Sequence, residues 1–221
     1  MAKSSPFPDP RHAPGDEPMA WGRELTPELV WAAYRRGIFP WYNEDTPVLW
    51  WSPDPRCVLF PYEFKVSPSL RKTLRHPRWS VSCDTDFAGV IRACAESPRP
   101  GQHGTWITDE IVAAYTALHR AGRAHSVEVR VDGELVGGLY GVAVGRVFCG
   151  ESMFFRRPDA SKVALAHLVS RLGAAGFALI DCQQVTPHLL SLGARAIPRD
   201  VFLDTLEAHR DLAPAVDPWA R

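Results

Sequence analysis

The sequence lacks the features of a secreted or membrane protein. Its five cysteines are an odd number and include no C-x-x-C pair, which argues against a disulfide framework and against a zinc site. No apolar run is long enough to span a bilayer, and the polar, proline-rich start contains no apolar segment typical of a signal peptide. We therefore expect a soluble, cytoplasmic protein with reduced thiols.

The sequence also has no net charge and none of the common hydrolase signatures. Lysines and arginines number 25, as do aspartates and glutamates, so any basic surface must be local. The motifs G-x-S-x-G, G-x-x-x-x-G-K-[ST] and H-E-x-x-H are missing. The eight histidines are scattered singly, so we expect no metal site, and we expect no cofactor.

The chain does contain enough apolar sequence for a sizeable core. Its 221 residues are 46% hydrophobic, which fits one large domain or a small domain beside a larger one. We expect a small N-terminal domain over residues 1–55, beginning with a loose, Pro- and Asp-rich tail over residues 1–20. The second domain is expected over residues 56–221.

Turn and capping signals divide the chain into elements. Thr26, Thr85 and Thr108 are expected as helix N-caps, and Asp132-Gly133 is a strong hairpin signal. We expect helices over residues 27–36, 68–76, 86–95, 109–120, 161–172 and 201–209, and strands over 48–51, 57–60, 79–83, 126–131, 135–144, 147–154 and 177–182. This order of elements predicts an α+β fold with a largely antiparallel sheet. The order consists of helices followed by a three-stranded meander, a helix and a strand.

Polar side chains follow two apolar strand-like runs. Asp181 and Gln183 are two residues apart, so on a strand they point to the same face. They are either edge-strand groups bonded to backbone or water, or they face a ligand. Glu151 and Ser152 follow Phe148-Cys-Gly, and here a ligand contact is favoured over a simple turn role.

Tryptophans among prolines and glycines give a sharper signal. Trp41, Trp50, Trp51 and Trp106 are expected in loops or short elements rather than in helical stripes. Aromatic residues are usually core, and we expect Trp50 or Trp51 to be partly so. A loop tryptophan is well placed to stack a nucleic-acid base, a contact worth about 1–3 kcal/mol.

One segment is locally basic. Residues 64–83 contain no acidic residue but carry Lys65, Arg71, Lys72, Arg75 and Arg78. Such a run is commonly a solvated helix face. In a chain of zero net charge it is also the clearest candidate for contacts with phosphates, and Arg35-Arg36 is a smaller second candidate.

In this order, the motifs resemble those of the leucyl/phenylalanyl-tRNA–protein transferases. The resemblance covers about residues 25–206 and is highly specific as a composite. It rests on YRRGIFPW (34–41), WWSPDPR (50–56), GTWIT (104–108), HSVEV (125–129), LVGG (135–138), FCGESMF (148–154), ASK (160–162), DCQ (181–183) and SLGA (191–194).

The resemblance implies an enzyme that moves Leu or Phe, with Met as a further candidate, from a charged tRNA to the N-terminal Arg or Lys of a protein. That transfer tags the acceptor for N-degron proteolysis. The resemblance also implies a domain similar to GNAT acetyltransferases beside the small N-terminal one. By position, the resemblance implies that Trp41 and Trp106 bind the terminal adenosine and that Phe148 and Glu151 bind the aminoacyl group. It places Asp181 and Gln183 at the reacting centre. The tRNA acceptor arm would be bound by Arg71, Lys72, Arg75 and Arg78.

The reaction is the aminolysis of an ester already activated by tRNA, so it needs no ATP. We expect Asp181 to hold the incoming N-terminus and help remove its proton, and Gln183 to orient Asp181 or bind the oxyanion. Glu151 offers a negative charge to the donor's α-amino group. Whether Asp181 is a true base or mainly a binding group stays open. The expected oligomeric state is a monomer.

Two other functions stay open at this point. The order of elements also suits a CoA-dependent N-acetyltransferase, but the turn at residues 156–161 contains no glycine to cradle a pyrophosphate, which disfavours CoA. A non-catalytic RNA-binding module explains the tryptophans and the basic helix. It leaves Glu151, Asp181 and Gln183 without a purpose.

Overall fold

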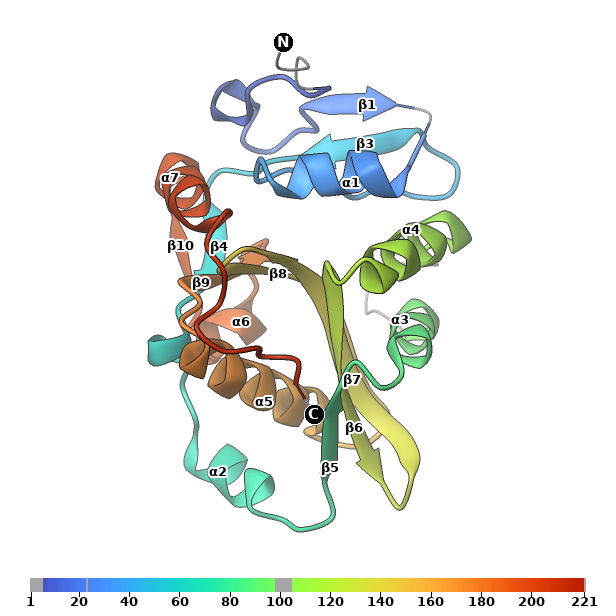
Figure 1. Ribbon diagram of the computed structural model, residues 1–221, viewed down its shortest axis with the longest axis vertical. Helices are drawn as coiled ribbons and strands as arrows, with labels where there is room; N and C mark the ends of the chain where they lie inside the picture. The colour runs from blue at the N-terminus through green and yellow to red at the C-terminus, as the bar shows by residue number, and fades with distance from the viewer. Residues whose placement is uncertain (1–5, 23, 98–104, 221) are drawn as a thin grey trace.

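A small three-stranded sheet sits at one end of a larger α+β body in the computed structural model (Figure 1), which describes residues 6–22, 24–97 and 105–220. The helices are α1 (Pro27–Tyr34), α2 (Pro68–Leu74), α3 (Phe87–Glu96), α4 (Asp109–Arg120), α5 (Ala160–Ala174), α6 (Pro187–Ser191) and α7 (Arg199–His209), with 3-10 turns η1 (Pro10–His12) and η2 (Pro61–Glu63). The strands are β1 (Ala20–Gly22), β2 (Phe39–Pro40), β3 (Val48–Trp51), β4 (Arg56–Leu59), β5 (Ser80–Cys83), β6 (Ala124–Val131), β7 (Glu134–Val144), β8 (Val147–Phe155), β9 (Leu179–Gln183) and β10 (Arg195–Ile197).

The predicted α+β class with a largely antiparallel sheet is confirmed. The large sheet has seven strands in the order β10-β4-β9-β8-β7-β6-β5, and the small one has the order β1-β3-β2. Every neighbouring pair of the large sheet is antiparallel except β8 and β9, which are parallel. Helices α3 and α4 cover one face of this sheet and α5 covers the other (Figure 1).

Two of the three predicted N-caps are confirmed. Thr26 accepts a hydrogen bond from the backbone N–H of Leu29 (3.2 Å), and Thr108 caps α4 in the same way. The prediction for α3 is wrong by one residue: Asp86 is the cap, accepting from Gly89 N–H at 3.0 Å. Thr85 instead donates its hydroxyl to the buried carboxylate of Glu128 (2.7 Å), because that charge needs donors.

The hairpin prediction is confirmed, whereas short elements were missed. Asp132 and Gly133 have φ values of 53° and 82°, as a two-residue hairpin turn requires. The missed elements are β1, β2, β10 and α6, each of five residues or fewer. Elements this short carry too few residues to show a periodicity.

The tail predicted as loose is anchored to the rest of the protein at several points; residues 1–5 lie outside the described residues. Phe7 is buried, and its ring meets that of Trp50 edge-on at 4.8 Å. The guanidinium of Arg199 donates to the backbone oxygens of Arg11 (3.2 Å) and Pro14 (3.3 Å). The prediction failed because the composition of the segment does not show that it contacts Trp50 and Arg199, which lie far away along the chain.

The small sheet shares its apolar core with the larger body. Val30 and Trp50 belong to the same buried cluster as Ile111 and Tyr115 of α4. Trp41 directly follows β2 and lines a pocket together with residues of the large sheet. Within the described residues, no helix is long and apolar enough to cross a membrane.

Candidate active site

A pocket of about 340 Å³ lies beside the point where β8 and β9 stop pairing. These parallel strands are paired over only three residues each, up to Cys149 and Asp181. The residues that follow on β8 (Gly150 and Glu151) and on β9 (Cys182 and Gln183) line the pocket. Split parallel strands expose side chains and backbone from the middle of a sheet, which is a common place for a ligand site.

A β-bulge places Glu151 in this pocket. Tyr140 pairs with Ser152 and Gly141 pairs with Gly150, so Glu151 is an extra residue without a partner on β7. Gly141 is required at the bulge because a Cβ there would lie 2.6 Å from the Phe148 ring. The glycine-rich run in the sequence is thus the signal of the bulge that aims the carboxylate.

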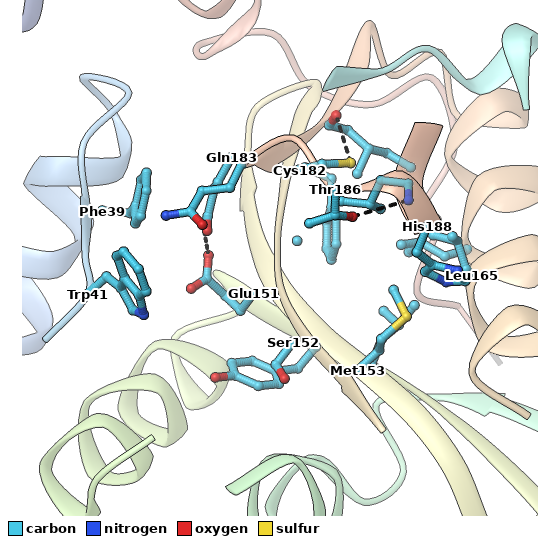
Figure 2. A pocket seen from close by; sticks show the side chains of 18 of the residues that line it. Phe39, Trp41, Glu151, Ser152, Met153, Leu165, Cys182, Gln183, Thr186 and His188 are labelled. Carbon is cyan, nitrogen blue, oxygen red and sulfur yellow. Dashed lines mark hydrogen bonds between the residues drawn. The ribbon is translucent and has the colours of Figure 1, made fainter. Parts of the chain in front are cut away.

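Glu151 is held by neutral hydrogen-bond donors (Figure 2). Its Oε1 accepts from Gln183 Nε2 at 2.9 Å and its Oε2 accepts from the Tyr115 hydroxyl at 3.2 Å. Tyr115 is in turn 2.5 Å from the Tyr34 hydroxyl. Burial raises the pKa of Glu151 to about 7, and the negative charge of Asp181 acts in the same direction. Hydrogen bonds from Tyr34, Tyr115 and Gln183 lower the pKa, but they offset only part of this rise. The pocket therefore holds a carboxyl group that exchanges its proton near neutral pH.

Asp181 lies outside the pocket walls. It is fully buried and forms a bidentate ion pair with Arg56, with Nε–Oδ1 at 2.8 Å and NH2–Oδ2 at 2.7 Å. It also accepts the backbone N–H of Gln183 at 2.9 Å. Gln183 has a φ of 63°, which ends the regular alternation of β9. Asp181 therefore packs against Arg56 while Gln183 reaches Glu151 in the pocket.

The pocket brings together most of the other predicted site residues. Trp41, Trp106, Phe148, Ser152 and Glu151 all line it, together with Gln183. Figure 2 shows Phe39 and Trp41 on one side of the Glu151–Gln183 pair, and Met153 and Leu165 on the other. Gly104, which precedes Trp106 in its motif, lies outside the described residues.

Of the two adjacent tryptophans, Trp50 is the core residue, at 2% exposure, which confirms that part of the prediction. Trp51 supports the pocket instead. Its indole N–H donates to the backbone oxygen of Trp41 at 2.7 Å, and the two rings lie 5.4 Å apart. This pairing fixes the chain that carries Trp41.

The basic residues lie away from the pocket. Arg71, Lys72, Arg75 and Arg78 are exposed on or just after α2, at the opposite end of the molecule from the small sheet (Figure 1). The helix is fixed to α5, where the Thr73 hydroxyl donates to Asp159 at 3.3 Å.

Three residues of the site escaped the sequence analysis. Arg56, Tyr34 and Tyr115 occur in motifs or helices that give no sign of a polar role, because their partners lie far away along the chain. No group of three His, Cys, Asp or Glu side chains suited to a metal ion occurs in the described part of the chain.

Solved structures give only a weak match. The similar ones include a GCN5-related N-acetyltransferase from Kribbella flavida, with a TM-score of 0.40 and 12% identity over 77% of this chain and 60% of that one. Another is the C-terminal domain of a putative lysylphosphatidylglycerol synthetase from Agrobacterium fabrum, at a TM-score of 0.39 and 13% identity, covering 86% of this chain and 58% of that one. Matches at this level carry no conclusion about function.

Sequence comparisons are far stronger. Residues 23–54 match the family model "Leucyl/phenylalanyl-tRNA protein transferase N-terminal domain", and residues 58–207 match "Leucyl/phenylalanyl-tRNA protein transferase". Similar curated proteins, each named leucyl/phenylalanyl-tRNA–protein transferase, include that of Cupriavidus taiwanensis, at 57% identity over 97% of this chain and 89% of the relative. The relative from Aromatoleum aromaticum is 59% identical over 91% of this chain and 85% of the relative's length. This chain therefore belongs to the leucyl/phenylalanyl-tRNA–protein transferase family.

Proposed function

We propose that this aminoacyltransferase uses the pocket beside β8 and β9 to join the aminoacyl group of a charged tRNA to the N-terminus of a protein. The relatives' name specifies leucyl- or phenylalanyl-tRNA as donor and protein as acceptor. The observation that supports this location is the Glu151–Gln183 pair, which has Trp41 on one side and the apolar side chains of Met153 and Leu165 on the other (Figure 2).

The apolar chamber suits the side chain of the transferred residue. Its walls are formed by Leu139, Phe148, Met153, Leu165, Leu168, Ile180 and Leu189. Burying a Leu or Phe side chain there contributes about 1.5–3 kcal/mol. Trp41, on the other side of the pair, and Trp106, which also lines the pocket, are proposed to stack the terminal adenosine of the tRNA, at about 1–3 kcal/mol for each base contact.

Glu151 is the group in the pocket that we propose takes the proton. The acceptor's α-amino nitrogen attacks the ester carbonyl carbon and its proton passes to Glu151. The ester C–O bond then breaks, and the leaving tRNA oxygen takes that proton from Glu151. An α-amino group has a pKa of about 7.7–8.0, so part of it is neutral at physiological pH. A carboxylate with a pKa of about 7 is well matched to receive the proton.

Asp181 then acts through Gln183. Its carboxylate is committed to Arg56 and to the backbone N–H of Gln183, so it fixes the residue that orients Glu151. This replaces the direct base role that the sequence pattern suggested. Most of the acceleration is expected from holding amine and ester together, where effective molarity contributes about 7–11 kcal/mol.

The finer assignments rest on the resemblance alone. We propose acceptor proteins beginning with Arg or Lys, a role in N-degron proteolysis, a cytoplasmic location and a monomeric state.

The proposed tRNA-binding helix makes a testable prediction. Replacing Arg71, Lys72, Arg75 and Arg78 on and beside α2 with alanine should weaken tRNA binding and lower the slope of log K against log salt, by about 0.7–0.9 for each phosphate that the variant no longer neutralises. Filter binding over a salt series measures both. Arg92→Ala, which removes an exposed charge on α3, should leave the slope unchanged; an equal reduction in this control would indicate non-specific attraction.

The transfer itself is tested with purified protein, tRNA charged with radiolabelled Leu or Phe, and a reporter protein that begins with Arg. We expect label on the reporter without ATP or CoA, and none when the reporter's N-terminus is acetylated. A parallel reaction with acetyl-CoA is expected to give no acetylated reporter. Bound tRNA without transfer would instead point to the RNA-binding module.

A further inference from the structure

Two cysteines face each other across β4 and β9. Cys57 pairs with Gln183 and Val58 pairs with Asp181, so Cys182 is the extra residue of a β-bulge on β9. In a bulge, two residues of one strand oppose a single residue of the other, which places Cys182 beside Cys57. Both side chains pack in the apolar cluster on the α5 face of the sheet.

The strand register brings the two cysteines side by side, and one of them reaches the pocket. Each thiol shifts the pKa of the other, as neighbouring side chains do. Cys57 is fully buried, whereas Cys182 is half-buried and lines the pocket, with its Sγ 3.8 Å from the Ile180 carbonyl (Figure 2). Opposed residues of antiparallel strands have Cα atoms about 4.5–5.5 Å apart, inside the range of about 4.4–6.8 Å that disulfides span.

We propose that Cys57 and Cys182 form a reversible disulfide when the enzyme meets hydrogen peroxide, and that this bond switches the pocket off. The sulfur of Cys182 attacks peroxide, becomes a sulfenic acid and releases one water. The sulfur of Cys57 then attacks the sulfenic sulfur, the S–O bond breaks, and the oxygen leaves as a second water with the remaining proton. The two thiols lose two electrons in total and one peroxide is reduced.

The surroundings select this pair over the other cysteines. The neighbouring Cys182 thiol lowers the pKa of Cys57, against the effect of burial, so Cys57 is suited to the second step. The Cys57 thiol and burial raise the pKa of Cys182, so the first step is expected to be slow and to need excess peroxide. Cys149 packs on the opposite face of the sheet, and burial raises the pKa of Cys83 to about 11.

The consequence for transfer rests on the function proposed above. Cys182 immediately precedes Gln183, whose side chain holds Glu151 at 2.9 Å. Pulling Cys182 toward β4 displaces that contact. Transfer is expected to fall by about tenfold or more, since a displacement of ~1 Å can cost ~10²-fold.

Peptide mapping tests the bond directly on the unaltered enzyme. Reduced protein is treated with hydrogen peroxide, remaining thiols are blocked, and trypsin is added. Cys57 then lies in peptide 57–65, Cys182 in peptide 172–195 and Cys149 in peptide 147–156. We expect the first two peptides to be linked and the link to disappear with a dithiol. Absence of this link, equal linkage to peptide 147–156, or only sulfinic acid at Cys182 would overturn the proposal.

Transfer assays on the same samples test the switch. We expect activity to fall with the linked peptide and to return with a dithiol. Cys57→Ala should keep activity and resist peroxide, whereas Cys83→Ala, a matched loss of a buried thiol, should stay sensitive. Linkage without loss of transfer, or loss in Cys57→Ala, would overturn the switch. A reduced enzyme without transfer would contradict the proposed function instead, and the peptide map would still decide the disulfide.

Discussion

Glu151 and Asp181 are two carboxylates with opposite surroundings. Asp181 faces a guanidinium that compensates its charge, whereas Glu151 faces only hydroxyl and amide groups. Neutral donors stabilise a carboxylate less than a cation does, so burial dominates at Glu151 and raises its pKa to about 7. This contrast separates a structural charge from a proton-exchanging one.

Glu151→Gln should change how stability depends on pH. The unfolded residue releases its proton near pH 4.3, at its ordinary pKa of about 4.3, whereas the folded one keeps it up to about pH 7. Because the folded state binds more protons in this window, the stability of the wild type falls as pH rises through it and levels off above. The variant should gain about 1–3 kcal/mol relative to wild type across the window, after allowing for partial exposure of the site.

Urea denaturation at a series of pH values measures this gain. Glu44→Gln, which removes an exposed carboxylate from a turn, should show no such trend. Parallel pH curves for wild type and Glu151→Gln would contradict a raised pKa at this residue.

Asp181→Asn should be costly because it leaves Arg56 charged, buried and without its counter-ion. Breaking a buried pair by removing one partner typically costs about 3–5 kcal/mol. The matched control is Asp211→Asn, whose solvent-screened pair with Arg35 at 2.8 Å should contribute little to stability. Denaturant midpoints of the two variants give the comparison; similar losses would argue against a special role for the buried pair.

At the level of elements, the bulge in the β7–β8 hairpin builds the site. It inserts Glu151 between two paired residues and turns its carboxylate toward Gln183 on β9. A second irregularity lies on β9. In a regular strand, Gln183 and Asp181 would point to the same face of the sheet, and this irregularity separates them. The site thus depends on two local departures from regular sheet geometry.

Gly141→Ala should disturb the first of these bulges. Its Cβ would lie 2.6 Å from the Phe148 ring, within a sheet that cannot yield freely, so we expect a loss of about 1–3 kcal/mol and a large fall in transfer. Gly150→Ala is the control for stability, because its Cβ would meet no atom closer than 3.7 Å. Thermal unfolding distinguishes the two, and equal tolerance would show that the bulge does not need glycine.

For the whole molecule, the shared core predicts cooperative unfolding. Trp50 of the small sheet and Tyr115 of the body belong to one buried cluster, and Phe7 packs on Trp50. Removing the small sheet would expose that cluster, so the two parts should unfold together despite separate sheets.

Phe7→Ala tests this coupling. It should lower the free energy of unfolding of the whole chain by about 3 kcal/mol, as a single transition seen equally by tryptophan fluorescence and far-UV circular dichroism. Pro6→Ala, at an exposed neighbouring position, should change little. A separate early fluorescence transition would mean that the small sheet is an independent unit.

Features that depend on contacts between near neighbours could be predicted from the amino-acid sequence. The Thr26 and Thr108 caps bond within three residues, the Asp132-Gly133 turn closes on itself, and the α+β order follows from local periodicity. The motifs also identified the family, because they are specific as a set even without their positions in space.

Which polar groups meet depends on how distant segments of the chain pack together. Arg56 and Asp181 are 125 residues apart and Tyr34 and Tyr115 are 81 apart, so no local pattern announces either contact. Strand order sets the first contact and the packing of α1 on α4 sets the second. The pKa of Glu151 follows from these long-range neighbours and its burial, which is why the sequence could identify the carboxylate but not its chemistry.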